Sequence, residues 1–98
     1  IDCSALVQIF YKFNGQFCPR DTKDQMRYFK KNAKINNLKK NNLIFWKGHV
    51  AICLSKNNLI HAYGPKKKVL IMNIKKTIEE IKTKSKLEII SIKKNGSN

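Results

Sequence analysis

The sequence predicts an α+β domain in which N-terminal helices pack on a mainly antiparallel β-sheet. Apolar residues recur at helical spacing in the first part of the chain and form short runs separated by turn signals after residue 42. Hydrophobic residues make up 42% of the 98, which is enough for a buried core. We therefore expect residues 1–98 to form a single domain. Because the chain begins with Ile1 rather than Met, we also expect it to be part of a longer protein.

The first predicted helix covers residues 3–14. Asp2 can serve as its N-cap, and Gly15 can end it in the left-handed conformation that glycine adopts easily. One face of this helix has the i, i+3, i+4, i+7 spacing of a core-facing surface and comprises Leu6, Ile9, Phe10 and Phe13. Cys3 is therefore expected in the first turn of a helix.

A second helix is expected near residues 22–32. Thr22 and Gln25 have the spacing of a capping box, in which each side chain bonds the backbone N–H of the other residue. Pro19 restricts the path of the connection before this helix. The polar segment 36–42 that follows is rich in Lys and Asn and predicts a loop.

The remainder is predicted to be mainly β-strands. The expected strands cover residues 43–46, 49–55, 59–63, 69–73 and 87–92, with a short helix at 74–82. The second strand is apolar on both faces, so we expect it at the centre of the sheet. If the loop after it has three residues, Ser55 pairs with Leu59 and His61 lies opposite Cys53. A bulge or a wider loop would bring His61 closer to His49.

The net charge of +15 admits two interpretations. Of the 21 basic residues 19 are Lys, and Lys, Ile and Asn together make up 43 of the 98 residues, which indicates a codon bias towards A and T. The alternative is a basic module that binds nucleic acid or a cell-wall polymer without chemistry. Such a module needs aromatic residues among its lysines, and none follows Tyr63. We expect nonspecific attraction of polyanions, no specific nucleic-acid binding and no membrane span.

The thiols and imidazoles are the groups that could carry chemistry. The positive end of a helix favours the thiolate of Cys3. Along its strand His49 shares a face with Ala51 and Cys53, whose small side chains would let helix 3–14 approach and bring Cys3 towards His49, while His61 is expected on the same face. The alternative is that Cys3 is a small buried apolar residue and that both histidines are core residues with satisfied hydrogen bonds. Cys18 and Cys53 fit structural roles, and no CxxC metal spacing occurs.

Four segments in order resemble motifs of the NlpC-type cysteine peptidases. They are IDCSALVQ at residues 1–8, PRDT at 19–22 followed by Gln25, LIFW at 43–46 followed by GHVAI at 48–52, and LIHA at 59–62. Each motif is weak alone, but the four together are specific. The resemblance implies a papain-like α+β fold and a thiol protease that hydrolyses amide bonds of peptidoglycan stem peptides between D-glutamate and a diamino acid.

The resemblance also implies roles for individual residues. Cys3 matches the nucleophile, His49 the general base and His61 the third polar residue that orients it. Asp2 and Ser4 match positions that help to bind the amino end of the stem peptide in some members. We expect the Cys3 sulfur within about 4 Å of a ring nitrogen of His49, and the other ring nitrogen facing His61. No metal or organic cofactor is implied, and the expected location is the cell envelope, the periplasm or the exterior, with cytoplasmic peptide recycling as another possibility.

The sequence departs from the family pattern in two places. Asn41 and Asn42 stand where the family usually has Gly-Asp, and the aromatic and glycine-containing segment that normally precedes the nucleophile is absent from these 98 residues. The 98-residue chain is therefore expected to lack part of the substrate site. A thiol amidase or transamidase on the same fold is the remaining alternative, and only the shape of the cleft would distinguish it.

Overall fold

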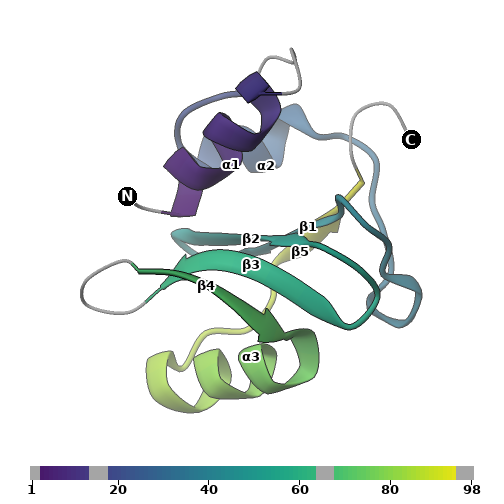
Figure 1. Ribbon diagram of the computed structural model, residues 1–98, viewed down its shortest axis with the longest axis vertical. Helices are drawn as coiled ribbons and strands as arrows, with labels where there is room; N and C mark the ends of the chain where they lie inside the picture. The colour runs from purple at the N-terminus through teal and green to yellow at the C-terminus, as the bar shows by residue number, and fades with distance from the viewer. Residues whose placement is uncertain (1–2, 14–17, 64–67, 95–98) are drawn as a thin grey trace.

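The computed structural model describes residues 3–13, 18–63 and 68–94 of the chain, and Figure 1 shows their arrangement. The elements in chain order are α1 (Cys3–Phe13), α2 (Thr22–Tyr28), the 3₁₀ turn η1 (Ile35–Asn37), β1 (Leu43–Trp46), β2 (His49–Cys53), β3 (Asn58–Tyr63), β4 (Lys68–Asn73), α3 (Ile74–Glu80), the π-helical turn η2 (Ile81–Ser85) and β5 (Ser91–Lys93). The predicted α+β class is confirmed. No helix among the described residues is long and apolar enough to cross a membrane.

The strands form one antiparallel sheet in the order β4-β3-β2-β1-β5. β2 is the middle strand, and all five of its residues are buried. The expectation that this strand is central is therefore confirmed. Figure 1 shows α1 and α2 on one face of the sheet and α3 on the other, so both faces are covered.

Two clusters of buried side chains form the core, one on each face. The cluster under α1 comprises Cys3, Val7, Tyr11, Cys18, Phe29, Leu43, Phe45, Val50, Ile52 and Ala62. The cluster under α3 comprises Leu38, Ile44, Trp46, Ala51, Cys53, Leu59, Ile74, Ile81 and Ile92. The expectation that helix 3–14 packs on Ala51 and Cys53 is therefore wrong. α1 faces Val50 and Ile52 with Val7 and Tyr11, and the small face receives the isoleucines of α3. The predicted core-facing surface of helix 3–14 is therefore also wrong, because Ile9 is 51% exposed.

The register of β2 against β3 also differs from the expectation. Cys53 pairs with Leu59, and Ile52 pairs with Ile60. The loop is wider than three residues because the N–H of Leu54 donates to the carbonyl of Asn58 at 2.8 Å. Continued along the strands, this register brings His61 level with Ala51, two residues closer to the start of β2 than predicted.

Several element boundaries differ from the predictions. α2 ends at Tyr28 instead of residue 32 because Phe29 is extended and buried in the core. The last strand is confined to Ser91–Lys93, where it pairs with β1. The strand predicted over 49–55 ends at Cys53, where the β2–β3 loop begins. The predicted helix end at Gly15 lies outside the described residues.

Candidate active site

The thiol of Cys3 lies at the end of the sheet where β1 turns into β2. Cys3 is the first described residue of α1 and is only 4% exposed. Its sulfur is 3.9 Å from the carbonyl oxygen of Gly48, the residue directly before His49. Gly48 has a φ of 73°, which glycine adopts without strain and which the tight turn between the paired residues Trp46 and His49 requires. The hairpin therefore places the start of β2, where His49 lies, near the first turn of α1.

The two histidines form a hydrogen-bonded pair at this end of the sheet. Nε2 of His49 is 3.0 Å from Nδ1 of His61, and the ring centroids are 5.2 Å apart. His61 is fully buried and His49 is 7% exposed. The expectation that a ring nitrogen of His49 faces His61 agrees with this geometry. The wider loop between β2 and β3 is what brings the two rings together.

Aromatic rings hold the imidazole pair on both sides. The ring of Tyr63 stacks on that of His61 with centroids 5.2 Å apart and planes 5° from parallel. The Trp46 ring lies 5.4 Å from that of His49. The hydroxyl of Tyr63 is 3.0 Å from that of Ser85, which ties β3 to the turn η2. These contacts restrict rotation of both imidazoles.

The second nitrogen of His61 faces a methionine on the edge strand. Nε2 of His61 is 3.3 Å from the thioether sulfur of Met72. Burial lowers the pKa of His61 below its ordinary value, and the carboxylate of Glu80 opposes this effect in part. The imidazole of His61 is therefore neutral at neutral pH, with one nitrogen donating and the other accepting.

The first turn of α1 is held by the segment that leads into α2. Nε2 of Gln25 donates to the carbonyl of Ser4 at 2.9 Å and to that of Pro19 at 2.8 Å. Nη1 of Arg20 donates to the hydroxyl of Ser4 at 2.8 Å. The capping-box interpretation of Gln25 is wrong, because its side chain bridges α1 and the Pro19 connection and Asp21 is the N-cap. The function of this buried amide is to position the turn that carries Cys3.

The structure thus brings three of the expected site residues, Cys3, His49 and His61, to one end of the sheet. Cys3 belongs to the cluster under α1. The ring partners of the two histidines, Trp46, Tyr63 and Met72, belong to or pack against the cluster under α3. Ser4 lies beside them and is buried with its hydroxyl bonded to Arg20. Asp2 lies outside the described residues. Among the described residues no three His, Cys, Asp or Glu side chains gather as metal ligands would.

The other two cysteines are placed as structural residues. Cys3, Cys18 and Cys53 are all buried free thiols. Burial raises the pKa of Cys18 to about 11 and that of Cys53 to about 12, so both stay protonated at neutral pH. Neither contributes a thiolate under ordinary conditions.

An α+β fold with a thiol at the start of a helix, next to the turn that leads into a strand beginning with histidine, is typical of the papain-like class of hydrolases. The model of the NlpC/P60 family matches residues 1–88, and the chain belongs to this family. The resemblance inferred from the four motifs is confirmed.

One curated relative is named as a peptidase. Dipeptidyl-peptidase 6 of Lysinibacillus sphaericus is 36% identical to this chain over 62 residues, which make up 63% of this chain and 23% of the relative. The matched part thus spans less than a quarter of that relative's length. Family membership and this relative support a peptidase as the general function.

Sequence reasoning missed several residues that surround the site. Tyr63 and Met72 contact His61, and Glu80 acts on it electrostatically from α3. Alternation along β3 places Tyr63 on the face of His61 and signals the first contact. The sequence did not indicate the contact between Met72 and His61, because that contact depends on the register between β3 and β4. Arg20 and Gln25 belonged to a quoted motif, but only the structure shows that both bond to Ser4.

Alkylation of the thiols tests this assignment. We expect iodoacetamide at neutral pH to modify Cys3 first, because the raised pKa values of Cys18 and Cys53 keep those sulfurs protonated. Exposure does not explain such a preference, since Cys3 and Cys18 are 4% and 5% exposed. Peptide mass spectrometry over time measures the order, with Cys3→Ser as the control that loses the fast phase. Earlier labelling of Cys53 would contradict the burial of β2.

The buried imidazole of His61 makes stability depend on pH. In the unfolded chain His61 takes up a proton near its ordinary pKa of 6.5, whereas in the folded protein it does so only at lower pH. Between these two pKa values the unfolded state therefore binds more protons than the folded state. As the pH is lowered through this range, we expect the free energy of unfolding to fall by up to about 1.4 kcal/mol per pH unit. Urea unfolding between pH 7.5 and 5 measures the slope, and His61→Gln should reduce it. An unchanged slope in His61→Gln would rule out this cause.

Proposed function

We propose that this chain is the catalytic domain of a cysteine endopeptidase that hydrolyses amide bonds in peptidoglycan stem peptides, between the γ-carboxyl of D-glutamate and a diamino acid. The observation that carries the proposal is the hydrogen-bonded pair of His49 and His61, because His49 directly follows Gly48, whose carbonyl oxygen lies 3.9 Å from the Cys3 sulfur. A nucleophile, a base and a group that orients the base are what such hydrolysis requires.

The first half of the proposed reaction forms a thioester. His49 takes the proton of the Cys3 thiol, and the sulfur attacks the γ-glutamyl carbonyl carbon. Backbone N–H groups at the start of α1, beginning with that of Cys3, are the proposed donors to the oxyanion. The carbon–nitrogen bond then breaks as His49 returns its proton to the leaving amine of the diamino acid.

The second half regenerates the thiol. His49 accepts a proton from water as the oxygen attacks the thioester carbon. The carbon–sulfur bond breaks, the sulfur recovers the proton from His49, and the product leaves as a free γ-carboxylic acid. His61 holds the ring of His49 throughout, and the proposed reaction uses only groups of this chain and water. The distance of about 4 Å between Cys3 sulfur and a His49 nitrogen stays a prediction.

Two further positions are proposed to bind the substrate. Asp2 and Ser4 flank the nucleophile in the sequence, and we assign them to the amino end of the stem peptide. Ser4 would act with its hydroxyl held by Arg20 at 2.8 Å. This substrate places the protein in the cell envelope, the periplasm or the exterior, or in the cytoplasm if it recycles released peptides.

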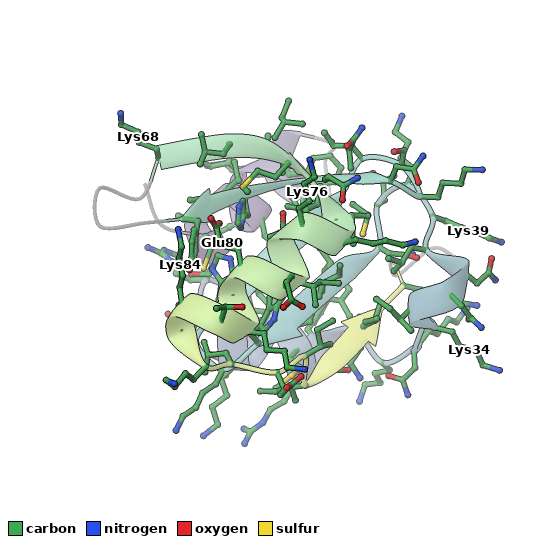
Figure 2. All side chains as sticks on the ribbon, turned by 90° about the horizontal axis from the view of Figure 1, so that it is seen from below. Lys34, Lys39, Lys68, Lys76, Glu80 and Lys84 are labelled. Atoms are coloured by element: carbon green, nitrogen blue, oxygen red, sulfur yellow. The ribbon has the colours of Figure 1, made fainter. Side chains whose placement is uncertain are left out.

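We also propose that the lysine surface attracts polyanions without specificity. A hollow of about 640 Å³ beyond the start of β1 is lined by Lys34, Lys39, Lys40 and Lys94 together with neighbouring asparagines. Figure 2 shows Lys34 and Lys39 on the opposite side of the molecule from Lys68 and Lys84. Positive charge at both ends of the domain supports a diffuse field rather than one recognition site.

The catalytic assignment predicts the effect of removing the thiol. In the intact protein we expect Cys3→Ala and Cys3→Ser to lower kcat by at least about 10³-fold, because attack on the carbonyl requires the sulfur. Digestion of purified peptidoglycan fragments, followed by mass spectrometry, measures the product and identifies the bond cleaved. Cys18→Ala is the matched control and should retain turnover, since Cys18 is a buried protonated thiol. Undiminished hydrolysis by Cys3→Ala would refute the assignment.

The charge assignment predicts how polyanions bind. DNA of two unrelated sequences should bind equally, with a log–log salt slope of about −0.9 per duplex phosphate neutralised. Changing Lys34, Lys39, Lys40 and Lys94 to Gln should weaken binding as much as changing Lys75, Lys76, Lys82 and Lys84, because both sets remove the same charge. Filter binding at two salt concentrations measures this. Discrimination between the sequences at about 0.15 M salt, or an effect confined to one lysine set, would show a specific site instead.

A further inference from the structure

We propose that Met72 is a positioning residue of the active site, whose thioether sulfur sets which nitrogen of His49 accepts the proton of Cys3. The proposal rests on the proposed function for its catalytic consequence. Its structural part, the tautomer of the two imidazoles, depends only on the contacts described above.

Met72 is placed differently from the other residues of its strand. β4 is an edge strand on which every residue except Met72 is exposed. In the β3–β4 register His61 pairs with Leu70, and Met72 pairs with Leu59, two residues along on the same face. The long thioether side chain spans this diagonal, and its sulfur ends 3.3 Å from Nε2 of the buried His61 ring.

A thioether sulfur carries no proton and can only accept a hydrogen bond. The nitrogen that faces it, Nε2 of His61, must therefore carry the ring proton. Because His61 is neutral, its Nδ1 is then an acceptor. The reversed tautomer would direct a nitrogen lone pair at the sulfur and leave the buried Nε2 without a hydrogen bond.

The tautomer of His61 also determines the tautomer of His49. Nδ1 of His61 accepts at 3.0 Å, so Nε2 of His49 must donate. In a neutral His49 the remaining nitrogen, Nδ1, is then the basic one. A sulfur atom on the edge strand thus determines that His49 uses Nδ1 as its base and keeps a proton on Nε2 for the bond to His61.

The charged and titratable groups around His61 are compatible with this role. His49 and Tyr63 face its ring directly. Glu80 on α3 is the nearby carboxylate that acts on His61, and its Oε1 is 3.2 Å from Nζ of Lys84. The carboxylate is thus bound by a lysine, and the atom in hydrogen-bond distance of Nε2 is the sulfur of Met72.

The tautomer is directly measurable in the full chain labelled with ¹⁵N-histidine. With only two histidines in these 98 residues, long-range ¹H–¹⁵N spectra show which ring nitrogens carry protons. At neutral pH we expect wild-type His61 to carry its proton on Nε2. Met72→Leu keeps the volume of the side chain and removes the acceptor, so a population with the proton on Nδ1 should appear. Met26→Leu is the matched control, because Met26 packs against the α1-side cluster and should leave both tautomers unchanged.

Kinetics then separate positioning from simple folding. In Met72→Leu we expect kcat to fall by about tenfold or more with little change in KM and with an altered pH profile. Thermal unfolding checks that the variant is folded. A wild-type His61 with its proton on Nδ1, or a Met72→Leu protein in which His61 keeps it entirely on Nε2, would overturn the proposal. If the tautomer of His61 does not change in Met72→Leu, the proposal about Met72 fails. The proposed peptidase function is tested separately by Cys3→Ala.

Discussion

Burial of β2 on both faces is the constraint on which the rest of the fold depends. A middle strand with five buried residues needs a helical layer above and below, and α1 and α3 supply these layers. Only at its ends can such a strand carry a polar side chain near the surface. His49 is the first residue of β2, and the tight turn at Gly48 brings it to the end of the sheet. Because both faces of β2 must be apolar, a basic side chain such as that of His49 can lie only at an end of this strand.

The position of the thiol depends on a second, polar constraint. α1 packs on the sheet through Val7 and Tyr11, but apolar packing alone does not define where its first turn ends. The amide of Gln25 does so by bonding the carbonyls of Ser4 and Pro19 at once. Gln25 and Ser4 are buried, so the bond between them is costly to break. The segment from Pro19 to Gln25 therefore acts as a brace for the nucleophile.

The sequence alone predicted the elements better than their contacts. The bounds of β1 were predicted correctly because Lys47-Gly48 is a clear turn signal, and the central place of β2 followed from its apolar residues. The helix that covers each face of β2 could not be deduced, because Val50 and Ala51 are both apolar and only their volumes differ. The β2–β3 register was off by two residues, since it depends on the bond from Leu54 to Asn58 within the loop.

For the candidate site, too, the sequence predicted the main residues better than their contacts. The motifs pointed to Cys3, His49 and His61, and the structure brings these residues to one end of the sheet. Residues that support them, such as Met72 and Glu80, come from elements whose pairing no local pattern encodes. Their contribution depends on register and on helix placement, which are properties of the folded chain.

A buried imidazole as the third member of the site has a physical rationale. His61 is fully buried between Tyr63 and Met72, where an ionised carboxylate would lose its hydration without a full set of donors. A neutral imidazole avoids that cost and still accepts from Nε2 of His49. The negative charge nearby belongs to Glu80, which is partly exposed and paired with Lys84. In the proposed reaction the imidazolium of His49 is therefore stabilised by the neutral acceptor in contact with it, Nδ1 of His61, and the core contains no permanent charge.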